Sequence, residues 1–333
     1  MLNTKKYTCL FIMLFASSCF AGQVQQSKKG SEQEDEFAWM KLMSVAFKEK
    51  SYEGRFVYNS NGHLNALQVI HTNKNGKEFE RLIPLNGSGE EVIRRGSELI
   101  CLHPEGGFTR LENSIPTGLF ANKFSRSSQS LDSLYQLAEQ GVGKVAGREA
   151  NRFLLTPIDA YRYGYELWID RESSLLLKSV MRNHAGDALE TFEFISIEVG
   201  VSIPETAFEF DMGKDLTGLR IMELDGSMSV DVNDDWRVQW VPDGFSMAGY
   251  EERRLSVNDS LLDSLVYTDG LNSFTVFIER GGDHAGQMGE RQEGATAAFS
   301  RKLINAKKTV FVTVVGELPM IAIKKIAESV RKN

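Results

Sequence analysis

The sequence predicts an α+β protein, made mainly of antiparallel β-strands and divided into two domains. Short runs of alternating apolar and polar residues follow one another with turn residues between them. These runs lie too close together for the helical crossovers that parallel strands require. A chain of 333 residues with 42% hydrophobic content is also long enough for two moderate cores. We therefore expect a large, strongly curved antiparallel sheet holding one or two helices, followed by a smaller sheet with one helix.

Residues 1–21 have the layout of an export signal. Lys5 and Lys6 precede an apolar run from Tyr7 to Phe15, and small residues end at Ala21. The run is too short to cross a membrane, and no later stretch reaches the length of about 18 apolar residues that a spanning helix needs. We therefore expect cleavage near Ala21 and a periplasmic protein that does not span the membrane. The alternative is a lipoprotein signal, in which Cys19 would be acylated and would anchor the chain.

The large domain is predicted over residues 36–212, after a flexible polar lead over residues 22–35. It begins with a helix from Phe37 to Phe47, where apolar residues recur at helical spacing. Two Asn-Gly pairs, Asn61-Gly62 and Asn75-Gly76, are hairpin signals. The first five predicted strands are Tyr52–Tyr58, Leu64–His71, Glu78–Leu85, Glu90–Arg95 and Glu98–Leu102.

A second helix is predicted between Ser125 and Gly141, because four apolar residues there fall on one side at helical spacing. Further strands should close the large domain. They are predicted at Gly143–Thr156, Tyr163–Asp170, Leu175–Asn183 and Leu189–Val199.

The small domain is predicted over residues 233–333, after a linker at 213–232 where the apolar pattern thins. Its strands are expected at Trp236–Val241, at Phe245–Leu255, from Val266 onward and, after a gap, at Thr309–Val315. A helix opens near Pro319, with an apolar face that includes Ile323 and Ile326.

No pattern of catalytic residues fits a known chemistry. The five histidines share no close spacing and have no cysteine partner, which argues against a zinc site. The glycine-rich pieces lack the spacing and the lysine of a phosphate loop, and no G-x-S-x-G sequence occurs. We therefore expect no enzyme, no catalytic residues, no cofactor and no metal.

The charge distribution points to a protein or lipid partner. The formal net charge of -7 argues against a general nucleic-acid binder, which needs a basic surface. From Gly294 to Asn333, however, eight basic residues stand against two acidic ones. This surplus could steer an acidic partner or phosphorylated lipid head groups, or it could simply form a solvated helix face. The curved apolar sheet could likewise enclose an acyl chain or be ordinary core.

Several segments, taken in order over essentially the whole mature chain, resemble the motifs of the RseB/MucB family. The segments are Val92–Gly96 and Val145–Arg148 in the first domain, then Trp240–Phe245, Tyr267–Leu271, Gly294–Thr296 and Val314–Pro319 in the second. The resemblance implies a large domain similar to the lipoprotein carriers LolA and LolB, an unclosed β-barrel around helices.

The resemblance also implies a function. Members of this family are periplasmic negative regulators of the envelope-stress sigma factor, sigma-E. They bind the periplasmic region of a membrane-spanning anti-sigma factor and protect it from regulated proteolysis, and lipid or lipopolysaccharide-like signals in the large-domain cavity release it. The competing hypothesis is a periplasmic lipid or lipoprotein carrier that uses the same cavity.

We expect the partner to contact the small domain at Tyr267, Phe274, Arg301, Lys324 and Lys325. The lysines and the arginine belong to the basic surplus, whereas Tyr267 and Phe274 could instead be structural. The oligomeric state stays open, with a dimer as one option.

Overall fold

The computed structural model describes residues 37–87, 89–103, 108–112, 131–210, 220–223, 236–254, 260–280, 288–305 and 308–332. The predicted signal peptide, the predicted lead and Cys19 lie outside these ranges. Only Arg220–Glu223 is described within the predicted linker, and it forms a strand. Among the described residues, neither helix is long and apolar enough to cross a membrane.

The large domain is a single 12-stranded sheet. Its order is β12-β6-β5-β4-β3-β2-β1-β11-β10-β9-β8-β7, so it has two free ends and is not closed into a barrel. Every pair is antiparallel except β6 with β12. The strands are β1 (Tyr52–Ser60), β2 (His63–Lys74), β3 (Lys77–Pro84), β4 (Glu91–Arg95), β5 (Glu98–Leu102), β6 (Phe108–Glu112), β7 (Tyr135–Val145), β8 (Arg148–Pro157), β9 (Gly164–Asp170), β10 (Leu176–Arg182), β11 (Ala188–Val199) and β12 (Arg220–Glu223).

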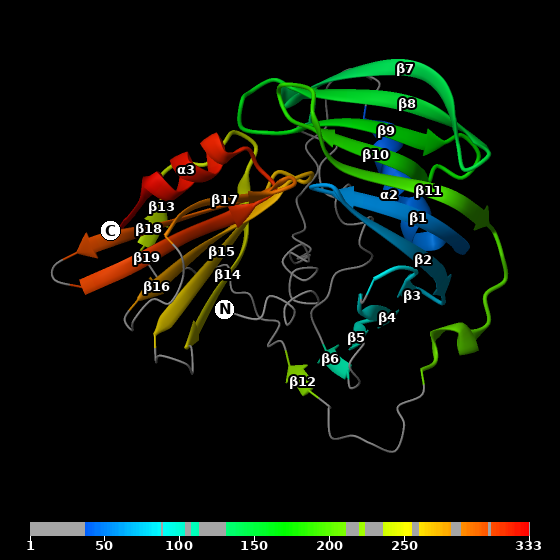
Figure 1. Ribbon diagram of the computed structural model, residues 1–333, viewed down its shortest axis with the longest axis horizontal. Coiled ribbons are helices and arrows are strands. Elements are labelled where there is room, and N and C mark those ends of the chain that lie inside the picture. The colour runs from blue at the N-terminus through cyan, green and yellow to red at the C-terminus, as the bar shows by residue number, and fades with distance from the viewer. Residues whose placement is uncertain are drawn as a thin grey trace, which may run out of the picture.

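Helix α2 (Ala38–Glu49) explains why this sheet is curved (Figure 1). Trp39 stacks on Phe153 of β8, with 4.4 Å between the ring centroids, whereas Phe47 meets Tyr52 of β1 edge-on at 6.2 Å. Strands β9, β10 and β11 separate β8 from β1 in the sheet order. One helix therefore packs against distant strands, which requires the sheet to bend around it. The predicted first helix is confirmed.

The predicted hairpins are confirmed where Asn-Gly sets the turn. Asn61 and Asn75 have positive φ angles of 51° and 55°, and the glycines after them have 80° and 78°. Positive φ at both central residues gives the type I′ turn, whose twist matches that of the strands on either side. These turns fix the register of β1 against β2 and of β2 against β3.

The predicted helix between Ser125 and Gly141 is wrong over its described part. Leu131–Ser133 form a single 3-10 turn (η2), and Tyr135–Val145 form the edge strand β7. Strand β7 pairs with β8 along most of its length, and this pairing outweighs the helical spacing of the apolar residues. Glycines within the segment also lower its helix propensity. The predicted strand Gly143–Thr156 is divided between β7 and β8, because Ala146 and Gly147, with φ angles of 50° and 79°, make another hairpin turn.

A further 3-10 turn, η3 (Glu205–Phe208), follows β11. It packs Phe208 against Ile93 and Ile100 in a separate apolar cluster on the large sheet. The guanidinium of Arg95 donates two hydrogen bonds to the carbonyl of Phe208, at 3.1 and 2.5 Å, and so fixes this turn.

The small domain combines a six-stranded antiparallel sheet, in the order β14-β15-β16-β19-β18-β17, with helix α3 and the two-stranded ribbon β13-β20. Figure 1 shows α3 lying along this sheet. The elements are β13 (Trp236–Val238), β14 (Ser246–Arg254), β15 (Leu261–Thr268), β16 (Ser273–Arg280), β17 (Gly289–Glu293), β18 (Thr296–Asn305), β19 (Lys308–Gly316), α3 (Met320–Ser329) and β20 (Val330–Lys332).

The closing helix is confirmed, and it buries Ile323 and Ile326 as the spacing predicts. Two details differ from the prediction. The expected gap before Thr309 contains strands β17 and β18. The segment from Val266 is not one strand but the end of β15, a turn and the start of β16. In the second case the Asp-Gly pair at 269–270 marks a turn that the sequence analysis did not use.

We predict that Met43→Ala destabilises the large domain by about 2–5 kcal/mol, because Met43 is fully buried in α2 and its removal leaves a cavity. Leu42→Ala is the matched control: Leu42 is 60% exposed, so its removal should change the free energy of unfolding by no more than about 0.5 kcal/mol. Urea unfolding followed by circular dichroism measures both. Equal losses would mean that α2 does not present this face to the sheet.

Candidate functional site at the interdomain junction

The two domains meet where the loop between β8 and β9, residues 158–163, reaches the small domain. We call this region the junction. On the small-domain side it contains the loop after β13, the turn between β15 and β16, the turn between β17 and β18, and the segment before α3. Figure 1 shows these loops converging between the two sheets.

Arg162 lies at the centre of the junction with its side chain fully buried. Its Nε donates to Asp269 Oδ2 at 2.9 Å, and it also bonds the carboxylate of Asp159 and the backbone carbonyl of Asp243. The guanidinium lies 5.3 Å from the centroid of the Phe245 ring. A guanidinium keeps its charge when buried, so it needs partners that satisfy its N–H groups. Because these partners come from both domains, Arg162 is satisfied only when the domains are docked.

Three tyrosine hydroxyls extend the network. Tyr165 donates to Asn272 Oδ1 at 2.6 Å, and the Asn272 amide in turn donates to the Tyr135 oxygen at 3.0 Å. Tyr163 donates to the carbonyl of Leu318 at 3.1 Å. Burial raises the pKa of Tyr135 and Tyr165 well above the usual value, so both hydroxyls stay protonated. The small domain is thus held through side chains that do not change charge near neutral pH.

Apolar side chains also pack across the junction. Leu271 and Ala295 belong to the small domain, yet they are buried in the core of the large one. At Gly244, where φ is 83°, a Cβ atom would lie 2.6 Å from Leu134 Cδ1. Any side chain at this position would be strained by the positive φ and would force the Leu134 side chain to move.

Tyr267 and Phe274, two of the expected partner contacts, pack against each other. Their rings stack with centroids 5.0 Å apart, and Phe274 is only 1% exposed. Phe274 therefore supports the core of the small domain and offers no surface in this conformation. Tyr267 is half-buried.

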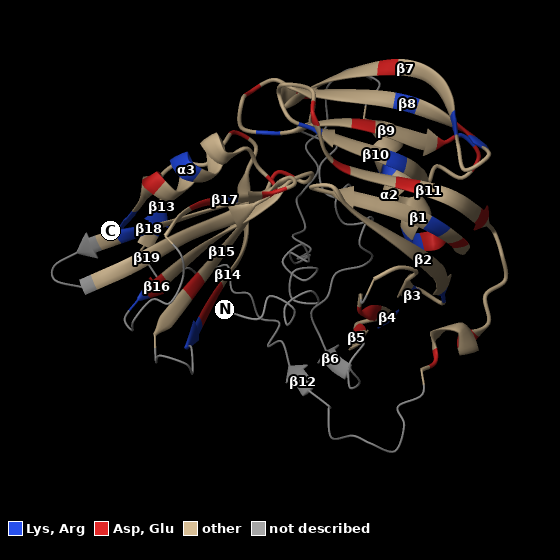
Figure 2. Ribbon diagram, viewed as in Figure 1, with Lys and Arg blue, Asp and Glu red and all other residues tan. Residues whose placement is uncertain are grey.

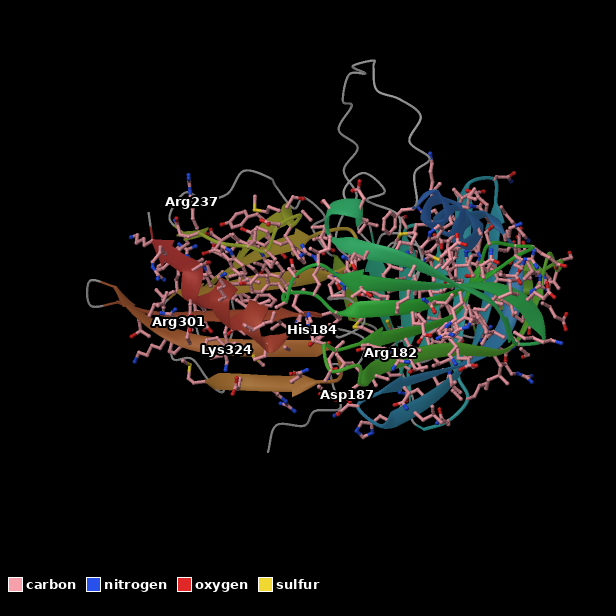
Figure 3. All side chains as sticks on the ribbon, turned by 90° about the horizontal axis from the view of Figure 1, so that it is seen from above. Arg182, His184, Asp187, Arg237, Arg301 and Lys324 are labelled. Carbon is pink, nitrogen blue, oxygen red and sulfur yellow. The ribbon has the colours of Figure 1, made fainter. Side chains whose placement is uncertain are left out.

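Arg301 and Lys324 lie on the outside of the small domain (Figure 3). Lys324 forms an ion pair with Glu290 of β17, and its side chain remains 41% exposed. Arg301 is partly exposed on β18. Figure 2 shows that acidic positions lie close to the basic ones on α3. This face is therefore a mixed surface rather than a purely basic one.

Lys325 is exposed at the edge of the junction and contacts the large domain. Its Nζ donates to the Tyr161 hydroxyl at 2.8 Å and lies 3.9 Å from the centroid of the Trp240 ring. Tyr161 and Trp240 also meet edge to face at 5.0 Å. The structure therefore separates the five expected residues into core, outer surface and junction, and does not gather them into one site.

The pattern of apolar and polar residues gave no sign of Arg162. The small-domain segments that carry the family resemblance could have indicated the junction, because each of them supplies residues to it. These residues are Asp243 and Gly244, Asp269 and Leu271, Gly294 and Ala295, and Leu318.

One group of described side chains has the composition of a metal site. His71, Glu78 and Glu80 are all buried in the large domain, and one possible ligand atom from each lies within 4.8 Å of the others. The spacing of histidines and cysteines in the sequence does not reveal this group, because two of its three residues are glutamates.

Comparison with known proteins gives family matches over both domains. The MucB/RseB N-terminal domain matches residues 35–212 and the MucB/RseB C-terminal domain matches residues 231–331. The sigma factor AlgU regulatory protein MucB of Pseudomonas aeruginosa is 32% identical over 324 residues, 96% of each chain. The sigma-E factor regulatory protein RseB of Escherichia coli K12 is 26% identical over 329 residues, 95% of this chain and 97% of the relative.

Solved structures also match over most of the chain. The P. aeruginosa MucA/MucB complex matches with a TM-score of 0.71 and 29% identity, over 89% of this chain and 98% of the matched one. MucB in complex with MucA(peri) matches with a TM-score of 0.69 and 31% identity, over the same shares of the two chains.

We predict that Arg162→Met lowers the free energy of unfolding by about 3–5 kcal/mol, because Asp269 is left buried without its charged partner. The control is Arg171→Met. Arg171 pairs with Glu149 on the surface, where the side chains are 51% and 69% exposed, so the expected loss is no more than about 1 kcal/mol. Guanidinium unfolding compares the two. Equal losses of unfolding free energy in the two variants would contradict the importance of Arg162 for domain docking.

Proposed function

The chain belongs to the MucB/RseB family, and on that premise we propose that it is a periplasmic regulator of a sigma-E-type factor. It binds the periplasmic region of an anti-sigma factor and protects that region from regulated proteolysis. The supporting observation is that the match to MucB, solved with MucA(peri), extends over 98% of the MucB chain and so includes both domains. The curated relatives are named regulatory proteins, in agreement with the expectation that the chain is not an enzyme.

In this proposal the large domain, residues 36–212, receives the signal. Phe56, Phe192 and Phe194 form a layer of aromatic rings in the same buried cluster as Met40 and Met43 of α2. A lipid or lipopolysaccharide-like molecule whose acyl chain displaced α2 would find an apolar surface beneath it.

The junction would carry that signal to the small domain, residues 233–333. Trp39 of α2 stacks on Phe153 of β8, and β8 leads directly into the loop that carries Arg162. Displacing α2 removes a contact that holds β8 in place. A shift of β8 would disturb the partners of Arg162 and loosen the small domain, which releases the anti-sigma factor.

Export completes the proposed function. A signal peptide cleaved near Ala21 would place the protein free in the periplasm, whereas acylation at Cys19 would tether it to a membrane. The mass of the N-terminal peptide of the exported protein distinguishes cleavage from acylation.

The alternative function is a periplasmic lipid or lipoprotein carrier, and the aromatic layer under α2 is the observation that favours it. Native mass spectrometry of the purified protein, followed by a transfer assay between two vesicle populations, separates the two functions. A carrier moves acyl-chain cargo between vesicles and leaves anti-sigma proteolysis unchanged. A regulator slows proteolysis, and bound lipid reverses this effect.

We predict that a saturating amount of the protein slows cleavage of the anti-sigma factor from the same organism by the protease that starts its destruction. The measurement is the rate of cleavage with and without the chain, using heat-denatured protein as the control. An unchanged rate at saturation would refute the proposed protection.

A charge reversal on the outer face tests the docking surface. We predict that Lys324→Glu weakens binding of the anti-sigma periplasmic region about three- to tenfold, mainly by slowing association, because the replacement repels an acidic partner. Lys77→Glu, at an exposed lysine on the β2–β3 hairpin of the large domain, should leave affinity unchanged. Lys325 is unsuitable because it contacts Tyr161 across the junction. Equal affinities in the two variants would place the interface elsewhere.

A further inference from the structure

A row of ionisable side chains crosses the interior of the large domain. His71 of β2 lies opposite Tyr52 of β1 on one side and opposite Glu80 of β3 on the other, and Glu80 lies opposite Arg94 of β4. Residues directly opposite each other on neighbouring strands point to the same face. All four are buried, with exposures of 0% for His71, 2% for Tyr52, 7% for Glu80 and 5% for Arg94.

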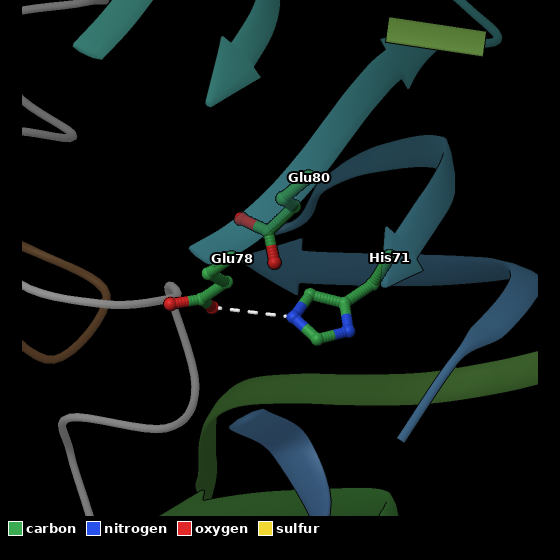
Figure 4. A group of neighbouring side chains, drawn as sticks. All are labelled: His71, Glu78 and Glu80. Atoms are coloured by element: carbon green, nitrogen blue, oxygen red, sulfur yellow. Dashed lines mark hydrogen bonds and ion pairs between the residues drawn. The ribbon is translucent and has the colours of Figure 1, made fainter. Parts of the chain in front are cut away.

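Glu78 joins this row, because it lies two residues before Glu80 on β3 and so shares its face (Figure 4). His71 Nε2 and Glu78 Oε1 are 3.3 Å apart. Two ligands bound at about 2.0–2.2 Å to one tetrahedral ion lie roughly 3.4 Å apart. The imidazole and the first carboxylate therefore already have the separation of two ligands of a single ion, and Glu80 completes a set of three within 4.8 Å.

The imidazole is also oriented as a ligand. His71 Nδ1 lies 2.9 Å from the carbonyl oxygen of Lys50, just after α2, and the ring stacks on Tyr52 at 4.7 Å. A carbonyl only accepts hydrogen bonds, so Nδ1 carries the proton and Nε2 is the atom that faces Glu78. This outer hydrogen bond to a carbonyl is the usual support of a histidine that binds a metal.

A neutral imidazole in this position would place the lone pair of Nε2 against a carboxylate oxygen. A positive charge between the two atoms removes the repulsion, and a proton or a metal ion could supply it. Glu78 Oε2 distinguishes these choices. It is buried and accepts no hydrogen bond among the described residues, and Glu78 is only 5% exposed. A proton on His71 serves Oε1 alone, and Oε2 points away from His71 in Figure 4. An ion at this position would also reach Oε2 once the carboxylate turns to bind it through both oxygens.

We propose that His71, Glu78 and Glu80 form a binding site for a divalent transition-metal ion. Two carboxylates supply negative charge for the ion, one of them opposite Arg94, and the imidazole binds the ion in its neutral form. Mixed imidazole and carboxylate ligands match Zn²⁺ and its neighbours better than Ca²⁺ or Mg²⁺, which prefer oxygen alone.

The bound ion links β2 to β3 and, through the Lys50 carbonyl, to the end of α2. Its expected effect is therefore on the stability of the large domain around α2. This inference rests on the geometry of three side chains and is independent of the proposed regulatory function.

The test uses the full-length chain without an affinity tag, treated with a chelator and then titrated with Zn²⁺ or Co²⁺ alone. We expect one ion per chain by calorimetry, a visible Co²⁺ absorption spectrum and a higher melting temperature with saturating Zn²⁺. Glu78→Gln keeps the shape of the side chain but removes a charged ligand. It should weaken binding at least tenfold and abolish the thermal shift.

The matched control is Glu90→Gln. Glu90 Oε1 lies 2.8 Å from His103 Nδ1, which makes a histidine–glutamate pair outside the cluster. This variant should bind Zn²⁺ within twofold of the unaltered chain. Circular dichroism of the metal-free proteins shows whether each variant folds, and Glu80→Gln replaces Glu78→Gln if the latter does not. No binding by the unaltered chain, or binding that survives Glu78→Gln and Glu80→Gln alike, overturns the site.

Discussion

The buried charge of Arg162 is the constraint on which the arrangement of the two domains depends. A guanidinium cannot lose its proton in a protein, so burial is tolerated only when every nearby acceptor is in position. Here one carboxylate comes from the large domain, through Asp159, and the other acceptors come from the small domain, through Asp269 and the carbonyl of Asp243. The tyrosine hydroxyls and the close approach at Gly244 then select one docked orientation.

This constraint connects the helix in the large domain with the surface of the small one. Helix α2 touches β8, β8 leads into the Arg162 loop, and that loop binds three separate segments of the small domain. Proteins that switch usually do so between discrete packed states, because well-packed regions do not deform continuously. A junction with a buried ion pair at its centre fits this pattern, because Arg162 keeps partners from both domains only while the domains are docked.

Sequence periodicity and turn residues were enough to predict the elements whose structure is determined by neighbouring residues. The Asn-Gly turns, helix α2 and helix α3 follow from neighbouring residues, whereas β7 is set by pairing with β8. The junction could not be derived in this way, because Arg162 and Asp269 are 107 residues apart and spacing carries no information on such contacts. Part of the cluster around His71 could be derived from the sequence. Once the turn at Asn75-Gly76 fixes the register of β2 against β3, His71 must lie opposite Glu80. For the partner site, spacing placed Lys324 and Lys325 on the helix but could not show that Lys325 turns toward Tyr161.

Whether the junction joins the domains into one cooperative unit is tested most directly by hydrogen exchange measured by mass spectrometry at increasing guanidinium concentrations. Peptides from β9 report on the large sheet, and peptides from β16 report on the small one. If Arg162 and its partners couple the domains, both sets should lose protection at the same denaturant midpoint. Loss of protection in β16 at a clearly lower midpoint, while β9 stays protected, would contradict this coupling.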